Sequence, residues 1–102
     1  MATNSQLSTR IKIDYDVELQ NNYKLVIHND DTTSFELVVY VLVEFCDKSY
    51  VDAIATAAYV HEHGKKDIME GTQEYLAAKR DKCIRFAREN GCNDFRMTVE
   101  EM

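Results

Sequence analysis

The segment from Phe35 to Cys46 restricts the fold most, because it is apolar on nearly every side of a helix. A helix of this kind is stable in water only when other elements cover it, so we expect it to be deeply buried. The whole chain has 102 residues, which is the length of one compact domain with a single core. Apolar residues recur along the segment at helical spacing, namely Phe35, Val38, Val39, Leu42, Phe45 and Cys46.

Alternating apolar and polar residues predict strands before and after the helical region. Apolar residues occupy every second position between Ile11 and Leu19, which is the period of a half-buried strand. Residues 20–22 form a predicted turn, and the alternation resumes at Tyr23, so we expect a hairpin over residues 10–28. A weaker pattern predicts a short strand over residues 65–70. Phe95, Met97 and Val99 predict a closing strand.

Capping residues predict the bounds of two further helices. Ser49, followed three residues later by Asp52, begins a helix that Gly64 ends. Thr72 begins a third helix, and Gly91 lies just past its end. The order strand, helix, helix, strand, helix, strand predicts an α+β sandwich, with an additional N-terminal strand over residues 11–19.

The charge of the chain argues against two classes of partner. The formal net charge is −6 and the isoelectric point is near 4.9, so the protein repels nucleic-acid backbones and anionic lipid surfaces. The longest apolar run, residues 35–43, contains Glu36 and is too short to cross a bilayer. Residues 1–8 lack the pattern of a secretory signal. We therefore expect a cytoplasmic protein with no nucleic-acid or membrane partner.

The reactive side chains give no pattern typical of an enzyme. Cys46, Cys83 and Cys92 are an odd number without a CxxC pair, which argues against a disulfide framework and a zinc site. Cys46 and Cys83 fall on apolar helix faces, where we expect them to be reduced and to act as small apolar side chains. The chain has no nucleophile motif, phosphate loop or cofactor fingerprint. We expect no catalysis, no cofactor and no metal.

A dense group of turn and capping residues, His28 to Ser34, connects the strand that begins at Tyr23 to the apolar helix. Such residues satisfy the free amides at a helix start, which is one interpretation of Asn29, Asp30 and Asp31. The second interpretation is that the turn fixes their oxygens as acceptors for a ligand. His61 lies on the apolar stripe of its helix, where a core histidine bonded to backbone is the alternative to a ligand contact.

These residues, taken in order, resemble the ClpS family. Residues 23–33 match its hallmark, an aromatic residue and Lys before an apolar strand, then Asn-Asp-Asp and Thr. Residues 60–64 are similar to its Val-His-x-x-Gly, and Thr72, Glu74, Lys79 and residues 87–90 follow at family-like spacing. The resemblance covers residues 23–100 and needs no insertion or deletion between Tyr23 and Asn90. It implies a three-stranded antiparallel sheet packed with three helices over residues 23–102, preceded by an N-terminal extension over residues 1–22.

The resemblance also implies a function, that of an adaptor which binds the first residue of N-degron substrates. An α-ammonium group brings three donors and a positive charge, so its site needs several acceptors. The resemblance assigns these to Asn29, Asp31 and His61, with Asp30 beside them. To accept, the His61 ring must be neutral, so binding should weaken as the pH falls through about 6.5. Family members hold the side chain of the first residue in an apolar pocket beneath the amine site, and the matching positions here are Ile27, Thr33, Phe35, Val38, Ala57 and Val60. Core packing is the alternative for these positions.

An apolar pocket of this kind predicts that Phe, Tyr, Trp and Leu are the preferred first residues. This chain departs from many family members in having Phe35 in place of Met, Ala57 in place of a larger residue, and Asp94 where a Leu contacts the pocket. Phe95 would replace that wall if the last strand shifted by one residue.

Glu74 and Lys79 match the positions that dock on the N-terminal domain of a ClpA- or ClpC-like AAA+ unfoldase, and a solvated helix face is the alternative for both. The alternative for the whole chain is an interaction domain of the same fold that has lost or altered N-terminal residue recognition.

Overall fold

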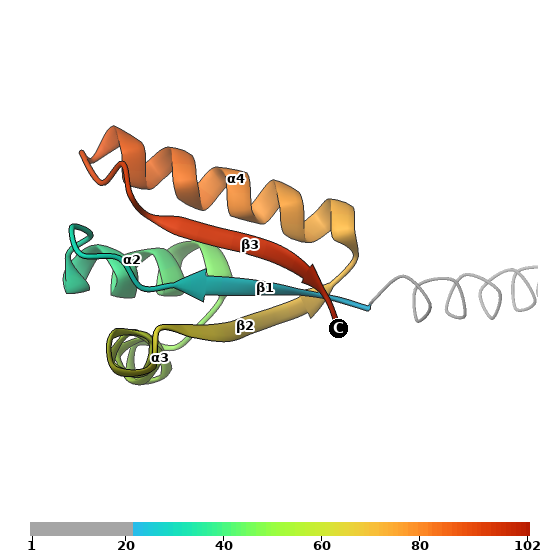
Figure 1. Ribbon diagram of the computed structural model, residues 1–102, viewed down its shortest axis with the longest axis horizontal. Coiled ribbons are helices and arrows are strands. Elements are labelled where there is room, and N and C mark those ends of the chain that lie inside the picture. The colour runs from blue at the N-terminus through green and yellow to red at the C-terminus, as the bar shows by residue number, and fades with distance from the viewer. Residues whose placement is uncertain (1–21) are drawn as a thin grey trace, which may run out of the picture.

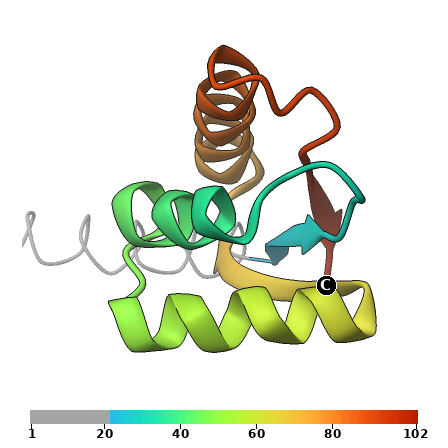
Figure 2. The same cartoon turned by 90° about the vertical axis from the view of Figure 1, so that its left-hand side faces the viewer.

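The computed structural model describes residues 22–102, which form three strands and three helices in the predicted order. The prediction of an α+β fold with this order is therefore confirmed, whereas the strand expected over residues 11–19 lies outside the described residues. Figures 1 and 2 show the three helices on one face of the sheet, with α4 nearest the β3 edge and α3 nearest the β2 edge. The elements are β1 (Tyr23–His28), α2 (Phe35–Cys46), α3 (Tyr50–His63), β2 (Lys65–Gly71), α4 (Gln73–Glu89) and β3 (Arg96–Glu101).

The sheet is antiparallel with the order β2-β1-β3, so β1 is the central strand. Both edges of β1 are occupied, because Tyr23 pairs with Gly71 of β2 and with Glu101 of β3. The expected hairpin between β1 and the preceding residues is therefore wrong for β1. Local alternation identified the strand but not its partners, which follow it by about 40 and 70 residues in the chain.

The helices begin where the capping residues are. The side-chain oxygens of Ser34, Ser49 and Thr72 each accept a hydrogen bond from the backbone N–H three residues later, at 3.1–3.2 Å. Caps of this kind contribute about 1 kcal/mol each. Gly64 ends α3 with a φ of 98°, a conformation that favours glycine.

The core lies between one face of the sheet and the three helices. Leu25 and Ile27 point into it from β1, and Leu42, Leu76 and Cys83 meet them from α2 and α4, all 0 % exposed. Cys46 is also buried, with its Sγ atom 4.0 Å from that of Cys83, and both cysteines are free. The two thiols thus pack as small side chains between α2 and α4.

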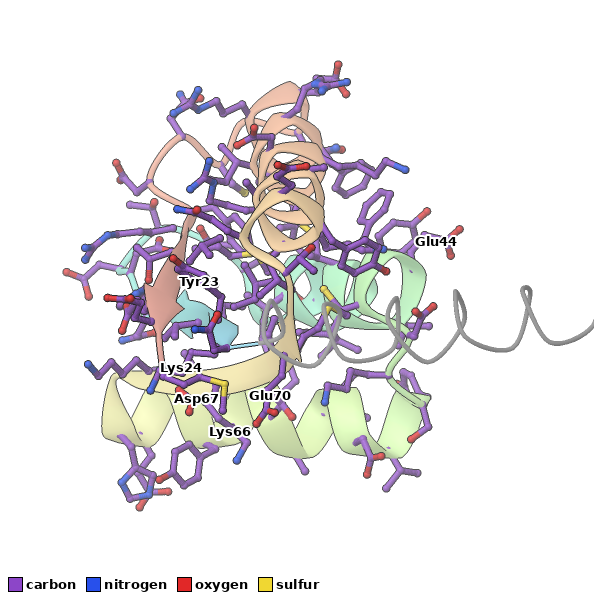
Figure 3. All side chains as sticks on the ribbon, turned by 90° about the vertical axis from the view of Figure 1, so that its right-hand side faces the viewer. Tyr23, Lys24, Glu44, Lys66, Asp67 and Glu70 are labelled. Atoms are coloured by element: carbon purple, nitrogen blue, oxygen red, sulfur yellow. The ribbon has the colours of Figure 1, made fainter. Side chains whose placement is uncertain are left out.

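The other face of the sheet is polar. Figure 3 shows Lys24 of β1 beside Asp67 of β2, and their charged groups are 3.4 Å apart. Val26 points away from Leu25 and Ile27 but is only 1 % exposed. A surface ion pair such as Lys24–Asp67 contributes at most about 1 kcal/mol to the free energy of unfolding. This face therefore adds little to stability beyond the burial of Val26.

Helix α2 is not covered on all sides, which corrects the expectation of deep burial. Val41 and Leu42 are buried, but Phe35, Tyr40 and Val43 are 44 %, 48 % and 36 % exposed. Figure 2 shows the reason, since α4 lies above α2, α3 lies below it and the sheet lies to one side. The remaining side has no covering element within residues 22–102, so an apolar surface is left on it.

Candidate functional site

A cavity of about 350 Å³ lies where β1 ends, between the loop that follows it and helices α2 and α3. Figure 2 shows this loop and the end of α3 on the same side of the molecule. The wall is formed by His28, Asn29, Asp30, Asp31, Thr33, Phe35, Val38, Ala57, Val60 and His61. The structure thus brings together on one wall the four residues expected to bind an amine, and all residues of the expected apolar pocket except Ile27.

One backbone hydrogen bond ties the loop to α3. The N–H of Asn29 donates to the carbonyl oxygen of Gly64, at 2.8 Å. Gly64 follows the last turn of α3, which carries His61. This contact explains how Asn29 and His61, which are 32 positions apart in the chain, come to line the same cavity.

Asp30 organises the loop between β1 and α2. Its Oδ1 accepts from the N–H groups of Thr32 and Thr33, at 2.9 and 2.7 Å, and lies 3.2 Å from the Thr32 hydroxyl. Partial burial alone would raise the pKa of the Asp30 carboxyl, but the hydrogen bonds from Thr33 and Thr32 outweigh burial and hold the pKa below its usual value. Asp30 is therefore an anion that stabilises the turn and adds negative charge to the cavity wall.

Replacement of Asp30 by Ala should lower the free energy of unfolding by about 1 kcal/mol at pH 7, because two backbone donors lose their acceptor. The pKa of this carboxyl is lower in the folded state, so its stabilisation is present above about pH 4 and is lost as the pH falls through the lowered pKa. Urea unfolding from pH 7 to pH 3 would measure the difference between wild type and D30A. D30N is the matched control, because it keeps an acceptor without the charge. A difference that stays constant with pH would contradict this role of Asp30.

Three further polar residues of the cavity are available to a ligand. The side chains of Asn29, Asp31 and His61 form no hydrogen bond to any residue within positions 22–102. Together they offer an amide oxygen, a carboxylate and an imidazole nitrogen, which are acceptors suited to a cationic donor.

The apolar part of the wall consists of Phe35 and Val38 from α2 and Ala57 and Val60 from α3. Ala57 and Val60 are each 3 % exposed, whereas Phe35 is 44 % exposed and forms a rim. The Thr33 hydroxyl is buried beside them and finds no hydrogen-bond partner among the described residues. The cavity thus combines acceptors at one end with an apolar body, which suits a ligand that has a cationic head and an apolar side chain.

His28 also lines the cavity, and sequence reasoning missed it. Its Nε2 atom lies 2.8 Å from the Thr98 hydroxyl, which donates to Glu100 Oε2 at 2.6 Å. The Thr98 proton is used in that bond, so Thr98 accepts from His28, whose Nδ1 then carries the lone pair. Burial, followed by the positive charge of Arg96, lowers the pKa of His28 and keeps this ring neutral. His28 directly precedes Asn29 in the predicted turn cluster, which is the local signal that could have identified it, whereas its contact with Thr98, 70 residues away, was not predictable from local sequence.

Three residues considered for the pocket are not on its wall. Ile27 is 0 % exposed and belongs to the core, because its side chain points into the opposite layer from that of His28. Asp94 lies beside the loop, where its Oδ2 accepts from the Thr32 hydroxyl at 2.9 Å. Phe95 is 4 % exposed and packs in the core, so the expectation that it replaces the missing wall is wrong.

The two residues expected to dock on an unfoldase lie elsewhere. Glu74 and Lys79 are on α4, which begins at the end of the sheet opposite the cavity (Figure 1). The ammonium group of Lys79 lies 5.5 Å from the centre of the exposed Tyr75 ring. Neither Glu74 nor Lys79 lines the cavity.

Two further properties of residues 22–102 concern membranes and metals. None of their helices is long and apolar enough to cross a membrane. Nor do these residues bring three His, Cys, Asp or Glu side chains close enough together to hold a metal ion.

Comparison with known proteins gives a consistent family match. The family model described as "ATP-dependent Clp protease adaptor protein ClpS" matches residues 18–99. The ClpS adapter protein of Brucella canis is 37% identical over 68 residues, which is 67% of this chain and 59% of that protein. The ClpS adapter protein of a Caulobacter species is 50% identical over 42 residues, which is 41% of this chain and 38% of that protein. The chain therefore spans less than two thirds of the length of these relatives.

A solved structure has the same fold. Agrobacterium tumefaciens ClpS2 bound to L-phenylalaninamide superposes with a TM-score of 0.75, over 78% of this chain and 95% of that chain. The sequence identity is 22%, so the likeness concerns the fold.

Proposed function

Since the chain belongs to the ClpS family of Clp protease adaptor proteins, we propose that it binds the free N-terminal residue of N-degron substrates and delivers them to a ClpA- or ClpC-type AAA+ unfoldase. In this proposal the protein is a cytoplasmic binding protein and not an enzyme. The single observation that carries it is the cavity, in which acceptors that have no partner among residues 22–102 occur together with an apolar wall.

We assign the α-ammonium group of the substrate to Asn29, Asp31 and His61. These side chains offer lone pairs to its three N–H donors, and the Asp31 charge offsets its positive charge. Asp30 acts differently, because one of its oxygens is already used by the turn. It keeps the loop in place and adds negative potential.

The side chain of the first residue would enter the apolar part of the cavity. An aromatic side chain buries about 150–250 Å², which at about 25 cal/mol per Å² contributes roughly 4–6 kcal/mol as an upper bound. Phe35 at the rim and the small Ala57 on the wall favour a large, flat side chain. The ligand bound to the Agrobacterium relative, L-phenylalaninamide, has the same two features, a free amine and an aromatic side chain.

Delivery requires that the substrate and the unfoldase bind at the same time. Glu74 and Lys79 lie on α4, away from the cavity, and we propose that they contact the N-terminal domain of the unfoldase. This arrangement leaves the cavity free in the complex.

A set of fluorescent peptides that differ only in the first residue would test the proposal by anisotropy. Phe, Tyr, Trp and Leu should bind at least about 100-fold more tightly than Ser or Glu, because only they fill the apolar cavity. A peptide in which Phe is moved from the first to the third position is the matched control and should bind as weakly as the Ser peptide. Equal binding of all peptides would favour the alternative, an interaction domain of this fold without N-terminal residue recognition.

A further inference from the structure

A second hollow, which we name the α2–α3 groove, runs along the uncovered side of α2 and the first half of α3. Its volume is about 310 Å³. Val43 and Tyr50 in its wall are 36 % and 66 % exposed. Apolar side chains gathered in an exposed hollow are typical of a binding surface. The groove is lined by Phe35, Val39, Tyr40, Val43, Tyr50 and Ile54, with Glu36 as its one charged residue.

The groove is next to the first cavity, because Phe35 lines both. Along α2, Phe35, Val39 and Val43 are four residues apart and so form a stripe about 12 Å long. An extended peptide rises about 3.3 Å per residue, so this stripe is as long as three or four residues of a bound chain.

We infer that the α2–α3 groove binds the residues of an N-degron that follow its second residue, and that it selects apolar side chains at positions three to five. This inference rests on the proposed function. A chain held by its first residue must leave the cavity past the rim, and Phe35 leads from that rim into the groove. The first contact has already fixed the peptide on the surface, so each further apolar contact adds affinity at little extra entropic cost. Glu36 disfavours acidic residues at these positions.

Two peptides with the same first two residues, Phe-Ser, would test this inference. One continues with three leucines and the other with three serines. The leucine peptide should bind wild type about tenfold more tightly, since burial of about 60 Å² of apolar surface is enough for a tenfold gain. The double variant V43S/Y50S should lose this preference, while both peptides still require a free amine. V51S is the matched control, because Val51 is 74 % exposed and does not line the groove.

The outcomes separate the groove from the cavity. If wild type binds both free peptides equally but rejects their acetylated forms, the groove inference is wrong and the proposed function stands. If acetylation changes nothing, the proposed function fails and the groove inference fails with it. Sedimentation equilibrium of wild type and V43S/Y50S excludes another occupant, since a dimer that the variant abolishes would assign the groove to a second copy of the chain. The wild-type comparison decides the matter even if the double variant does not fold.

Discussion

A peptide that begins with phenylalanine should bind about 10⁴-fold more weakly once its α-amine is acetylated. Acetylation removes the positive charge and two of the three donors, and it adds bulk where Asn29, Asp31 and His61 line the cavity. Their acceptors would then be shielded from water without a partner, which is what makes such selection strong. Competition against a fluorescent Phe peptide would measure the ratio. A peptide acetylated only on an internal lysine is the control and should compete like the unmodified one.

The ratio of the affinities for the free and the acetylated peptide also identifies the residues that bind the amine. N29A and H61A should each weaken binding of the free peptide by about tenfold to 100-fold, the effect of losing a charge-assisted hydrogen bond, and should reduce the ratio by the same factor. E62A is the matched control, since Glu62 is an exposed neighbour of His61 that does not line the cavity. An unchanged ratio in H61A would show that His61 does not contact the amine.

Replacement of Ile27 by Ala should have the largest effect on stability, lowering the free energy of unfolding by about 2–5 kcal/mol. The side chain is 0 % exposed near the end of the middle strand, where a smaller residue leaves a void in the core. Urea unfolding would measure the loss, with V51A as a surface control that changes stability by less than about 0.5 kcal/mol.

The folded fraction of I27A should bind the Phe peptide nearly as well as wild type, because Ile27 is absent from the cavity wall. A variant of normal stability and poor affinity would instead assign Ile27 to the pocket, as the family resemblance implied.

The sequence predicted those features that depend on residues close together in the chain. The capping residues Ser49 and Thr72 and the terminal Gly64 marked the helix bounds, because a cap is satisfied within three or four residues. The turn around Asp30 was predictable for the same reason. The family resemblance added what no local rule contains, that His61 would lie beside this turn.

The remaining features depend on contacts between distant segments. Alternation identified β1 but could not show that β2 and β3 would occupy both of its edges. The sequence pattern of α2 indicated an apolar helix. How much of that helix stays exposed depends on how many other elements cover it, which the pattern does not contain. The hydrogen bonds of His28 with Thr98, and of Thr98 with Glu100, join the end of β1 to the last strand. Ile27 and His28 face opposite sides of the sheet because successive side chains of a strand alternate, and a motif match does not consider this alternation.

The central claim is that Asn29, Asp31 and His61 bind a free α-amine above an apolar pocket. The most direct measurement follows the backbone amide resonances of the ¹⁵N-labelled protein during titration with L-phenylalaninamide and with its N-acetyl form. We expect saturable shifts for residues 29–33 and for His61 with the free amine, and none at the same concentrations with the acetylated compound. Equal shifts with both compounds, or shifts confined to residues outside the cavity, would contradict the claim.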